Sequence, residues 1–205
     1  MKIEVKISKK RIDYEQSMQI LEKRVDDVIN GKKNELLWVI EHNSVYTAGA
    51  SSKDADLIDK NIKTIKTNRG GKHTYHGPGQ KVIYFVLNLN NREKNIRRLI
   101  SNIENCIIEI LNEYKIKGYA DKKNIGIWVN NQKKLKKIAA IGIKVRKWIA
   151  FHGFSINVSN DLKKYNSIVP CGIKNMNVIN MKYLNNTNYK NIEQIIIKKF
   201  LKIFL

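Results

Sequence analysis

The spacing of apolar side chains changes several times along the first half of the chain, and each change marks a different element. Residues 2–7 alternate apolar and charged side chains, which is typical of an edge strand. From residue 14 to residue 28 the apolar positions recur every three or four, which predicts a helix that Asp13 caps and Gly31 ends. Residues 36–41, LLWVIE, form a short apolar run that favours a buried strand.

The second half of the chain continues the mixture of strands and helices. Residues 95–116 show a helical apolar period, and so do residues 191–204. Between them, three strand-like segments at 125–129, 138–145 and 148–158 predict a β-meander. Because strands and helices do not alternate strictly, the sequence predicts an α+β fold built on a mixed, mainly antiparallel sheet flanked by helices.

One segment interrupts these regular patterns. Residues 69–80, RGGKHTYHGPGQ, combine four glycines with a proline, two histidines and an arginine, so we expect neither a regular helix nor a strand there. Glycines permit positive φ and let a ligand lie against backbone N–H groups. The strand-like residues 62–66 and 82–87 would hold the loop on both sides, while the small residues 47–49 would let another backbone approach. The loop is therefore a predicted binding site, and the alternative is a tight glycine turn that binds nothing.

The length and the N-terminal sequence limit the class of protein. With 205 residues, the chain suits a single domain, residues 1–205, with a proper core. No apolar run reaches the roughly 18 residues of a membrane span. The first ten residues, MKIEVKISKK, lack the uninterrupted apolar run of a secretory signal. We therefore expect a cytoplasmic protein that has no membrane partner.

The charge is strongly positive. Lys and Arg number 39 against 18 Asp and Glu, which gives a formal net charge of +21. The excess is spread along the chain, so it fits either a general bias towards Lys, Asn and Ile or a positive face for an acidic partner. The sequence contains no zinc-finger, helix-turn-helix or RNP-type pattern, so we expect no nucleic-acid partner, although a basic RNA-binding module is an alternative.

The two cysteines have different settings. They lack the paired spacing of a zinc site, so no metal site is expected. Cys106 lies beside the apolar stripe of the helix at 95–116, which favours core packing. Cys171 stands between Pro170 and Gly172, an arrangement that would present its thiol at a turn. A free thiol has a pKa of about 8.5, so a nucleophilic Cys171 needs a nearby cation.

A lysine and a histidine in the predicted meander are candidates for the site around such a thiol. Lys137 stands where a lysine-rich run meets small apolar residues, so it either lies on the surface or points inward as the cation that Cys171 needs. His152 and Gly153 interrupt an apolar strand, which is typical of a pocket wall, and a core histidine bonded to the backbone is the alternative.

Four motifs occur in the order RGGKHTYHGPGQ, KIAAIG, FHGFSIN and IVPCGI. Together they resemble the lipoyl(octanoyl) transferases, a family related in fold to the biotin and lipoate protein ligases, and the resemblance runs from residue 41 to residue 173. The family transfers octanoate from acyl carrier protein to a lysine of lipoate-dependent enzymes. The resemblance therefore implies a ligase-like catalytic domain that uses no cofactor. Its implied partners are octanoyl-acyl carrier protein and the lipoyl domains of 2-oxoacid dehydrogenases and of the glycine cleavage H protein.

The resemblance also implies the site residues. Cys171 matches the family's acyl-thioester nucleophile, and Lys137 matches the partner that lowers its pKa. The implied acyl pocket comes from three segments of the chain: Arg69, Gly70, Gly71, Lys72, His73, Thr74, Tyr75 and His76, then Ala140, Ile141 and Gly142, then Gly153, Phe154 and Ser155. Ser44 replaces the proline that is usual in the family, and Ala140 replaces a serine found in some members.

The function implied by the resemblance is a two-step acyl transfer. The Cys171 thiolate attacks the octanoyl thioester, and the lysine of the acceptor then attacks the acyl-enzyme. Exchange of one thioester for another needs no ATP. An ATP-dependent lipoate or biotin ligase on the same scaffold is the alternative enzyme, but a ligase has no need of a cysteine after proline.

Overall fold

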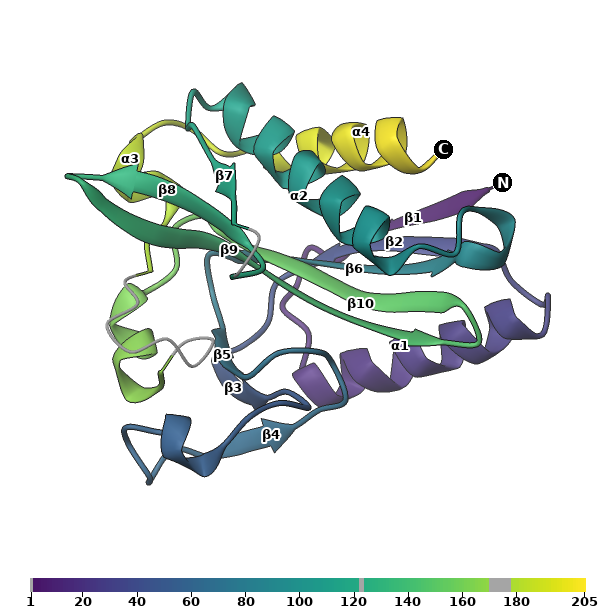
Figure 1. The fold of residues 1–205 in the computed structure, drawn as a ribbon, viewed down its shortest axis with the longest axis horizontal. Helices are drawn as coiled ribbons and strands as arrows, with labels where there is room; N and C mark the ends of the chain where they lie inside the picture. The colour runs from purple at the N-terminus through teal and green to yellow at the C-terminus, as the bar shows by residue number, and fades with distance from the viewer. Residues whose placement is uncertain (1, 122–123, 170–177) are drawn as a thin grey trace.

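The computed structural model describes residues 2–121, 124–169 and 178–205. Within these residues the centre of the molecule is a seven-stranded sheet (Figure 1). Its strands, in spatial order, are β1 (Ile3–Ile7), β2 (Glu35–Ile40), β6 (Gln80–Asn88), β10 (Ile149–Asn157), β9 (Lys134–Arg146), β8 (Ile127–Asn131) and β7 (Tyr119–Ala120). Within this sheet, as far as the structure describes it, only the β1–β2 pair is parallel. The predicted fold class, α+β with a mixed and mainly antiparallel sheet, is confirmed.

Helices cover both faces of this sheet (Figure 1). Helix α1 (Tyr14–Ile29) packs on one face, and α2 (Ile96–Glu113) packs with α4 (Ile192–Phe204) on the other. The predicted cap of α1 is confirmed, because the Asp13 side chain accepts hydrogen bonds from two backbone N–H groups of the first turn. The chain leaves α1 through Gly31 at φ +67°, a left-handed conformation that glycine adopts without steric cost.

A second, three-stranded sheet lies beside the main one (Figure 1). Its order is β4 (Thr64–Lys66), β3 (Val45–Ala48) and β5 (His73–His76), with β3 parallel to β4 and antiparallel to β5. The expectation that residues 69–80 contain no regular strand is therefore wrong for β5. The motif read alone gives no sign of β3, whose backbone groups pair with β5 and make the strand stable.

Short helices complete the described chain. They are η1 (Asp54–Asp56), η2 (Leu89–Asn91), η3 (Leu162–Ser167) and α3 (Met181–Leu184). A small cluster of Tyr75, Tyr165 and Ile168 packs under the second sheet. Within the described ranges, no helix combines the length and the apolar character needed to cross a membrane.

The two faces of the main sheet are covered by separate apolar clusters. Along β6 the side chains alternate, so that Phe85 faces α2 and α4 while Tyr84 faces α1. Cys106 lies in the α2 cluster with no exposed surface, and burial raises the pKa of its thiol to about 12. The prediction that Cys106 is a packing residue is confirmed, because a thiol with this pKa stays protonated at neutral pH.

Candidate active site

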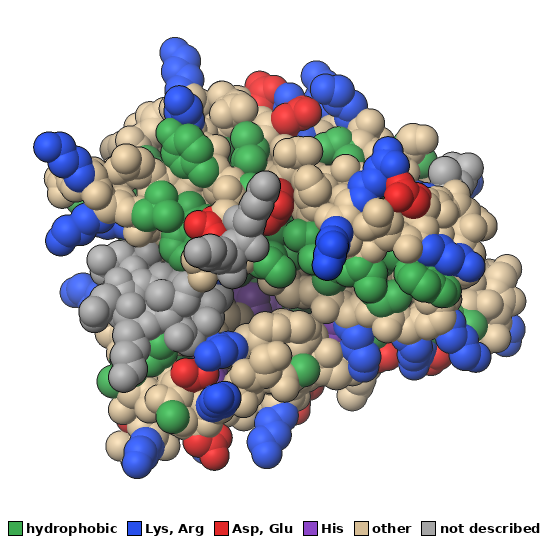
Figure 2. Space-filling view, viewed as in Figure 1, with side chains coloured by type: hydrophobic (Ala, Val, Ile, Leu, Met, Phe, Trp, Pro, Cys, Tyr) green, Lys and Arg blue, Asp and Glu red, His purple; other side chains and the backbone are tan. Residues whose placement is uncertain are grey.

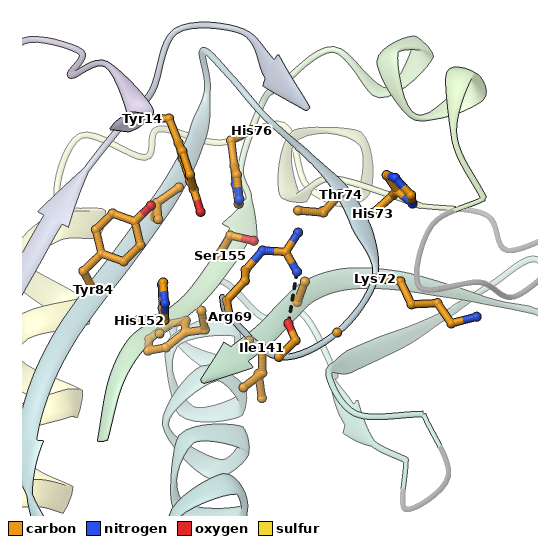
Figure 3. Close-up of a pocket in the computed structure, with 17 residues that line it drawn as sticks. Tyr14, Arg69, Lys72, His73, Thr74, His76, Tyr84, Ile141, His152 and Ser155 are labelled. Atoms are coloured by element: carbon orange, nitrogen blue, oxygen red, sulfur yellow. Dashed lines mark hydrogen bonds between the residues drawn. The ribbon is translucent and has the colours of Figure 1, made fainter. Parts of the chain in front are cut away.

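A cavity opens between the main sheet and the second sheet. It contains about 540 Å³ of empty space, a figure that includes open solvent at its mouth. Figure 2 shows histidine side chains at the bottom of a recess on this side of the molecule. We call it the main cavity. The structure brings every residue of the predicted acyl pocket to its lining except Tyr75 (Figure 3).

The Arg69–Lys72 loop forms one wall of the main cavity and is fixed by close backbone contacts. The Gly70 N–H donates to the Ile143 carbonyl of β9 at 3.1 Å. A Cβ added at Gly49 would lie 2.3 Å from the Gly71 carbonyl oxygen, so the predicted close approach of another backbone to residues 47–49 is confirmed. Gly71 has φ +88°, a conformation that strains other residues. The loop is thus held rigidly without covering its own backbone with side chains.

Two glycines on neighbouring strands form the opposite wall. Gly153 of β10 pairs with Gly142 of β9. A Cβ at Gly153 would lie 1.9 Å from the Ile83 carbonyl oxygen, and a Cβ at Gly142 would lie 3.1 Å from the Gly70 carbonyl oxygen. The missing side chain of Gly142 lets the loop come close to the sheet, and that of Gly153 lets β10 lie close to β6, which leaves a narrow slot beside the loop.

Arg69 places a fixed positive charge in this slot (Figure 3). The side chain is buried, and its Nη2 donates to the Thr47 carbonyl at 3.1 Å and to the Thr47 hydroxyl at 2.7 Å. Its Nη1 donates to the Gly70 carbonyl at 3.0 Å. The guanidinium therefore ties the loop to β3. It also adds to the effect of burial in lowering the pKa of the cavity histidines.

The histidines of the main cavity are neutral at physiological pH. Burial is the largest cause that lowers the pKa of His76, and likewise of His152, to about 3. His76 Nδ1 lies 2.6 Å from Gln80 Oε1, and His152 Nε2 lies 2.7 Å from Asn68 Oδ1. His152 lines the cavity at φ +67°, so the interpretation of FHG as a pocket wall is confirmed. The histidines therefore form a polar but uncharged part of the wall beside the Arg69 guanidinium.

Tyrosines close the side of the cavity that lies opposite Lys72 in Figure 3. The Tyr14 hydroxyl donates to Thr67 Oγ1 at 3.1 Å, and the Tyr84 hydroxyl lies 2.9 Å from His42 Nε2. Neither tyrosine was predicted as a site residue, and neither was Val82, which also lines the cavity. In the sequence both tyrosines occupy regular apolar positions of a helix and a strand, so their pattern is the same as that of core residues.

Lys137 points inward. It is 5% exposed, its Nζ donates to the Ile125 carbonyl at 2.8 Å, and the ammonium lies 5.2 Å from the centre of the Trp128 ring. The alternative of a surface lysine is therefore wrong. Lys137 lines a second depression, which we call the side groove. The side groove shares five lining residues with the main cavity: Gly70, Gly71, Lys72, Ile141 and Gly142.

Cys171 lies outside the described residues, so its predicted pairing with Lys137 stays a prediction. The described chain on either side of this segment has defined contacts. Before it, the Val169 N–H donates to the Asp56 carbonyl at 2.7 Å. After it, Val178 forms a parallel β-bridge with Lys137, and the Ile179 N–H donates to the Lys137 carbonyl at 3.0 Å. The chain that follows the cysteine motif thus runs directly beside the predicted catalytic lysine.

Comparisons with known proteins agree with the motifs. A family model described as the lipoyl protein ligase A/B catalytic domain matches residues 13–201. The chain is 42% identical over 205 residues to the octanoyltransferase of Ehrlichia chaffeensis, which covers 98% of this chain and 96% of that protein. The chain belongs to the octanoyltransferases. The octanoyltransferase of Wolbachia pipientis from Culex pipiens is also 42% identical, over 200 residues, covering 97% of this chain and 98% of that protein. The predicted family is confirmed.

Solved structures show that the octanoyltransferase chain has the fold of the lipoate ligases. A lipoate protein ligase-like protein of Thermoplasma acidophilum, solved with bound lipoic acid, superimposes with a TM-score of 0.73 at 15% identity. The match covers 99% of this chain and 86% of that protein. At this level of identity the likeness concerns the fold. Within the described part of the octanoyltransferase, no group of three or more His, Cys, Asp or Glu could hold a metal ion.

Proposed function

We propose that this octanoyltransferase carries its octanoyl group on Cys171 as a thioester and passes it to a lysine of a lipoyl domain. The single observation that carries the proposal is the position of Lys137, a buried ammonium beside the main cavity and beside the chain that follows the cysteine motif. The family supports the octanoyl group as the cargo. Octanoyl-acyl carrier protein as donor, and a cytoplasmic location, are part of the proposal.

The main cavity would hold the octanoyl chain. Ile141, Phe154 and Val82 supply apolar surface, and the neutral histidines add no charge that the chain would have to desolvate. The glycine loop would lie against the thioester end of the octanoyl group, because that loop also lines the side groove that contains Lys137. Gly70 and Gly71 would allow the carbonyl group of the thioester to approach the backbone closely.

In the first step, the Cys171 thiolate attacks the carbonyl carbon of the octanoyl thioester, and the thiolate of the donor leaves and takes up a proton. In the second, the amine of the acceptor lysine attacks the acyl-enzyme, loses a proton, and releases the Cys171 thiolate. A neighbouring ammonium favours the thiolate form of a cysteine, so Lys137 would lower the pKa of Cys171 and could exchange the protons of both steps. Exchange of thioesters needs no ATP.

The net charge of +21 agrees with acidic protein partners. If donor and acceptor are negatively charged, long-range attraction would raise their association rates. The second-order rate of acylation should then fall as salt is raised.

Intact-mass measurement after incubation with octanoyl-acyl carrier protein tests the proposal. The wild-type chain should gain one octanoyl group, and peptide mapping should place it on the Cys171 peptide as a hydroxylamine-labile adduct. Cys171→Ala should abolish the adduct, whereas the matched control Cys106→Ala should keep it, because the Cys106 thiol is buried in α2 and stays protonated. An adduct of the same yield on Cys171→Ala would refute the mechanism. A requirement for ATP would point to a ligase instead.

A further inference from the structure

The side groove is a second depression beside the glycine loop. It contains about 940 Å³ of empty space including the part open to solvent, and it runs between α2 and the side of β9 that faces α2. Ile100 of α2 and Ile125, Ile141 and Ile143 give it an apolar lining. Ile125 is 46% exposed, so part of this lining faces water in the free protein. An apolar depression with a few polar groups beside a buried lysine is a candidate binding surface.

The side groove continues from the main cavity. The two share the Gly70–Lys72 loop together with Ile141 and Gly142 of β9, so a ligand that passes beside this loop can occupy both. If the octanoyl chain lies in the main cavity, as proposed above, the rest of the donor begins at the sulfur of the thioester. This part of the donor must extend out of the enzyme through an opening beside Lys137. The side groove is a described depression that contains Lys137 and adjoins the main cavity.

The charges around the side groove favour an anionic arm over a second ammonium. The Lys137 and Lys72 side chains both line it. The Lys72 ammonium lies 3.4 Å from Asp56 Oδ2, and the lysine side chain is 29% exposed, so part of the ammonium is open to an incoming anion. Arg97 is exposed one turn before Ile100, and residues three apart share a helix face. A protonated lysine of the acceptor would be repelled here, and its short side chain would leave most of the apolar lining uncovered.

We propose that the side groove binds the phosphopantetheine arm of the acyl carrier protein donor, with the arm's gem-dimethyl and methylene groups on Ile100 and Ile143 and its phosphate towards Lys72 and Arg97. This assignment rests on the proposed function, because it needs the octanoyl thioester to lie between the main cavity and the side groove. The two amides of the arm find polar partners in the same lining, namely the Asn124 side chain and the backbone of the glycine loop.

The test compares two small donors that differ only in the arm. Octanoyl-phosphopantetheine carries the whole arm, and octanoyl-N-acetylcysteamine carries only its thiol end. The readout is the ratio of their kcat/KM values for acylation of the enzyme, measured by intact mass. The wild-type ratio should be well above one, and Ile100→Asp should lower it about tenfold, since the new carboxylate repels the phosphate and removes apolar contact. Octanoyl-acyl carrier protein should lose a similar factor with this variant.

The matched control is Ile108→Asp, which introduces the same charge on α2 at a half-buried isoleucine that lies outside the groove lining. It should keep the wild-type ratio. Lys72→Gln should reduce acylation by octanoyl-phosphopantetheine more than by octanoyl-pantetheine, which lacks the phosphate, whereas the exposed control Lys63→Gln should not distinguish the two donors.

The possible failures can be told apart. Absence of acylation of the wild type by octanoyl-acyl carrier protein would refute the proposed function and this inference with it. Acylation by that donor but by neither small donor would leave the proposed function standing and show that the enzyme does not recognise the arm by itself. Acylation by both donors with a ratio near one, or an equal loss with both donors in Ile100→Asp, would leave the proposed function standing and show that the side groove does not bind the arm. Circular dichroism of each variant verifies that it is folded before the ratio is used.

Discussion

The two faces of the main sheet differ in the chemistry that they bury. The face under α2 and α4 is covered by aliphatic and aromatic side chains, and the thiol of Cys106 in this cluster is inert. The face towards the main cavity buries Arg69, His76 and His152 together with tyrosines that keep their hydroxyl groups hydrogen bonded. The apolar cluster under α2 and α4 stabilises the fold, and this allows the cavity face to hold polar groups that cost stability.

The difference can be seen within a single strand. Phe85 and Tyr84 are neighbours on β6, yet Phe85 packs against Phe200 of α4 while Tyr84 reaches His42 and lines the main cavity. Because strand side chains alternate between faces, one residue step separates a residue needed for stability from a residue that shapes the site.

Truncation of Phe85 should have the largest effect on stability. Phe85→Ala should lower the free energy of unfolding by about 3 to 5 kcal/mol, because the side chain is fully buried and its loss leaves a cavity. Tyr84→Phe should cost only about 1 kcal/mol, since it keeps the buried ring and loses only the hydrogen bonding of the hydroxyl. Urea denaturation of both variants measures the difference. Equal losses of unfolding free energy in the two variants would show that the two faces do not differ in their contribution to stability.

Removal of the buried ammonium should have the next largest effect, and on activity rather than on folding. Lys137→Met should slow acylation by octanoyl-acyl carrier protein about 100-fold, the scale of one acid–base group, and shift its pH profile upward as the thiol loses its neighbouring cation. Lys137→Arg should restore the pH profile without restoring proton exchange, because arginine stays protonated. Reactions quenched at several times between pH 6 and 9, and analysed by intact-mass measurement, give the acylation rate and its dependence on pH. An unchanged profile in Lys137→Met would remove the proposed role of the lysine.

Much of the fold follows from patterns that depend on neighbouring residues alone. Asp13 and Gly31 mark the ends of α1, and the helical spacing at the C-terminus becomes α4, because capping and amphipathic period are local properties. The strand His73–His76 was not predicted, because it depends on pairing with β3, which lies about 25 residues earlier in the chain.

The residues of the site also differ in whether the sequence alone reveals them. The glycine loop and FHG are visible in the sequence because glycine and histidine are unusual in strands. Tyr14 and Tyr84 have no such signal, since an aromatic residue in an apolar stripe has the same pattern whether a cavity or a core lies behind it. The inward direction of Lys137 likewise depends on Ile125 and Trp128, which sequence spacing does not place.

The tyrosine end of the main cavity should set the acyl chain length. Tyr84→Ala would open space at the side opposite Lys72, so the ratio of decanoyl to octanoyl transfer should rise about tenfold, since each buried methylene contributes roughly 0.8 kcal/mol. The control is Tyr183→Ala, which removes a tyrosine that is 62% exposed and lies outside the cavity lining. Competition between the two acyl thioesters, read by mass, measures the ratio. An unchanged ratio in Tyr84→Ala would place the closed end elsewhere.

The smallest expected effect is a loss of stability in mild acid. It comes from the buried histidines of the main cavity. The pKa of His76 and of His152 is lowered to about 3 in the folded chain, against about 6.5 when unfolded. The unfolded chain therefore binds more protons below pH 6.5, and stability falls as the pH drops below that value. Each of these histidines should lower the free energy of unfolding at pH 5.5 by roughly 1 kcal/mol relative to its value at pH 7.5.

Replacing one histidine isolates this contribution. His76→Gln should weaken the fall in unfolding free energy between pH 7.5 and pH 5.5 by about 1 kcal/mol, whatever it does to stability at pH 7.5. The carboxyl groups whose pKa is lowered by nearby basic groups, such as Glu4 beside Arg24, gain their protons at lower pH and do not interfere in this window. The measurement is urea denaturation at both pH values. If His76→Gln keeps the full wild-type slope, His76 is not held neutral by its burial, and the polar face of the sheet tolerates charge more readily than its packing indicates.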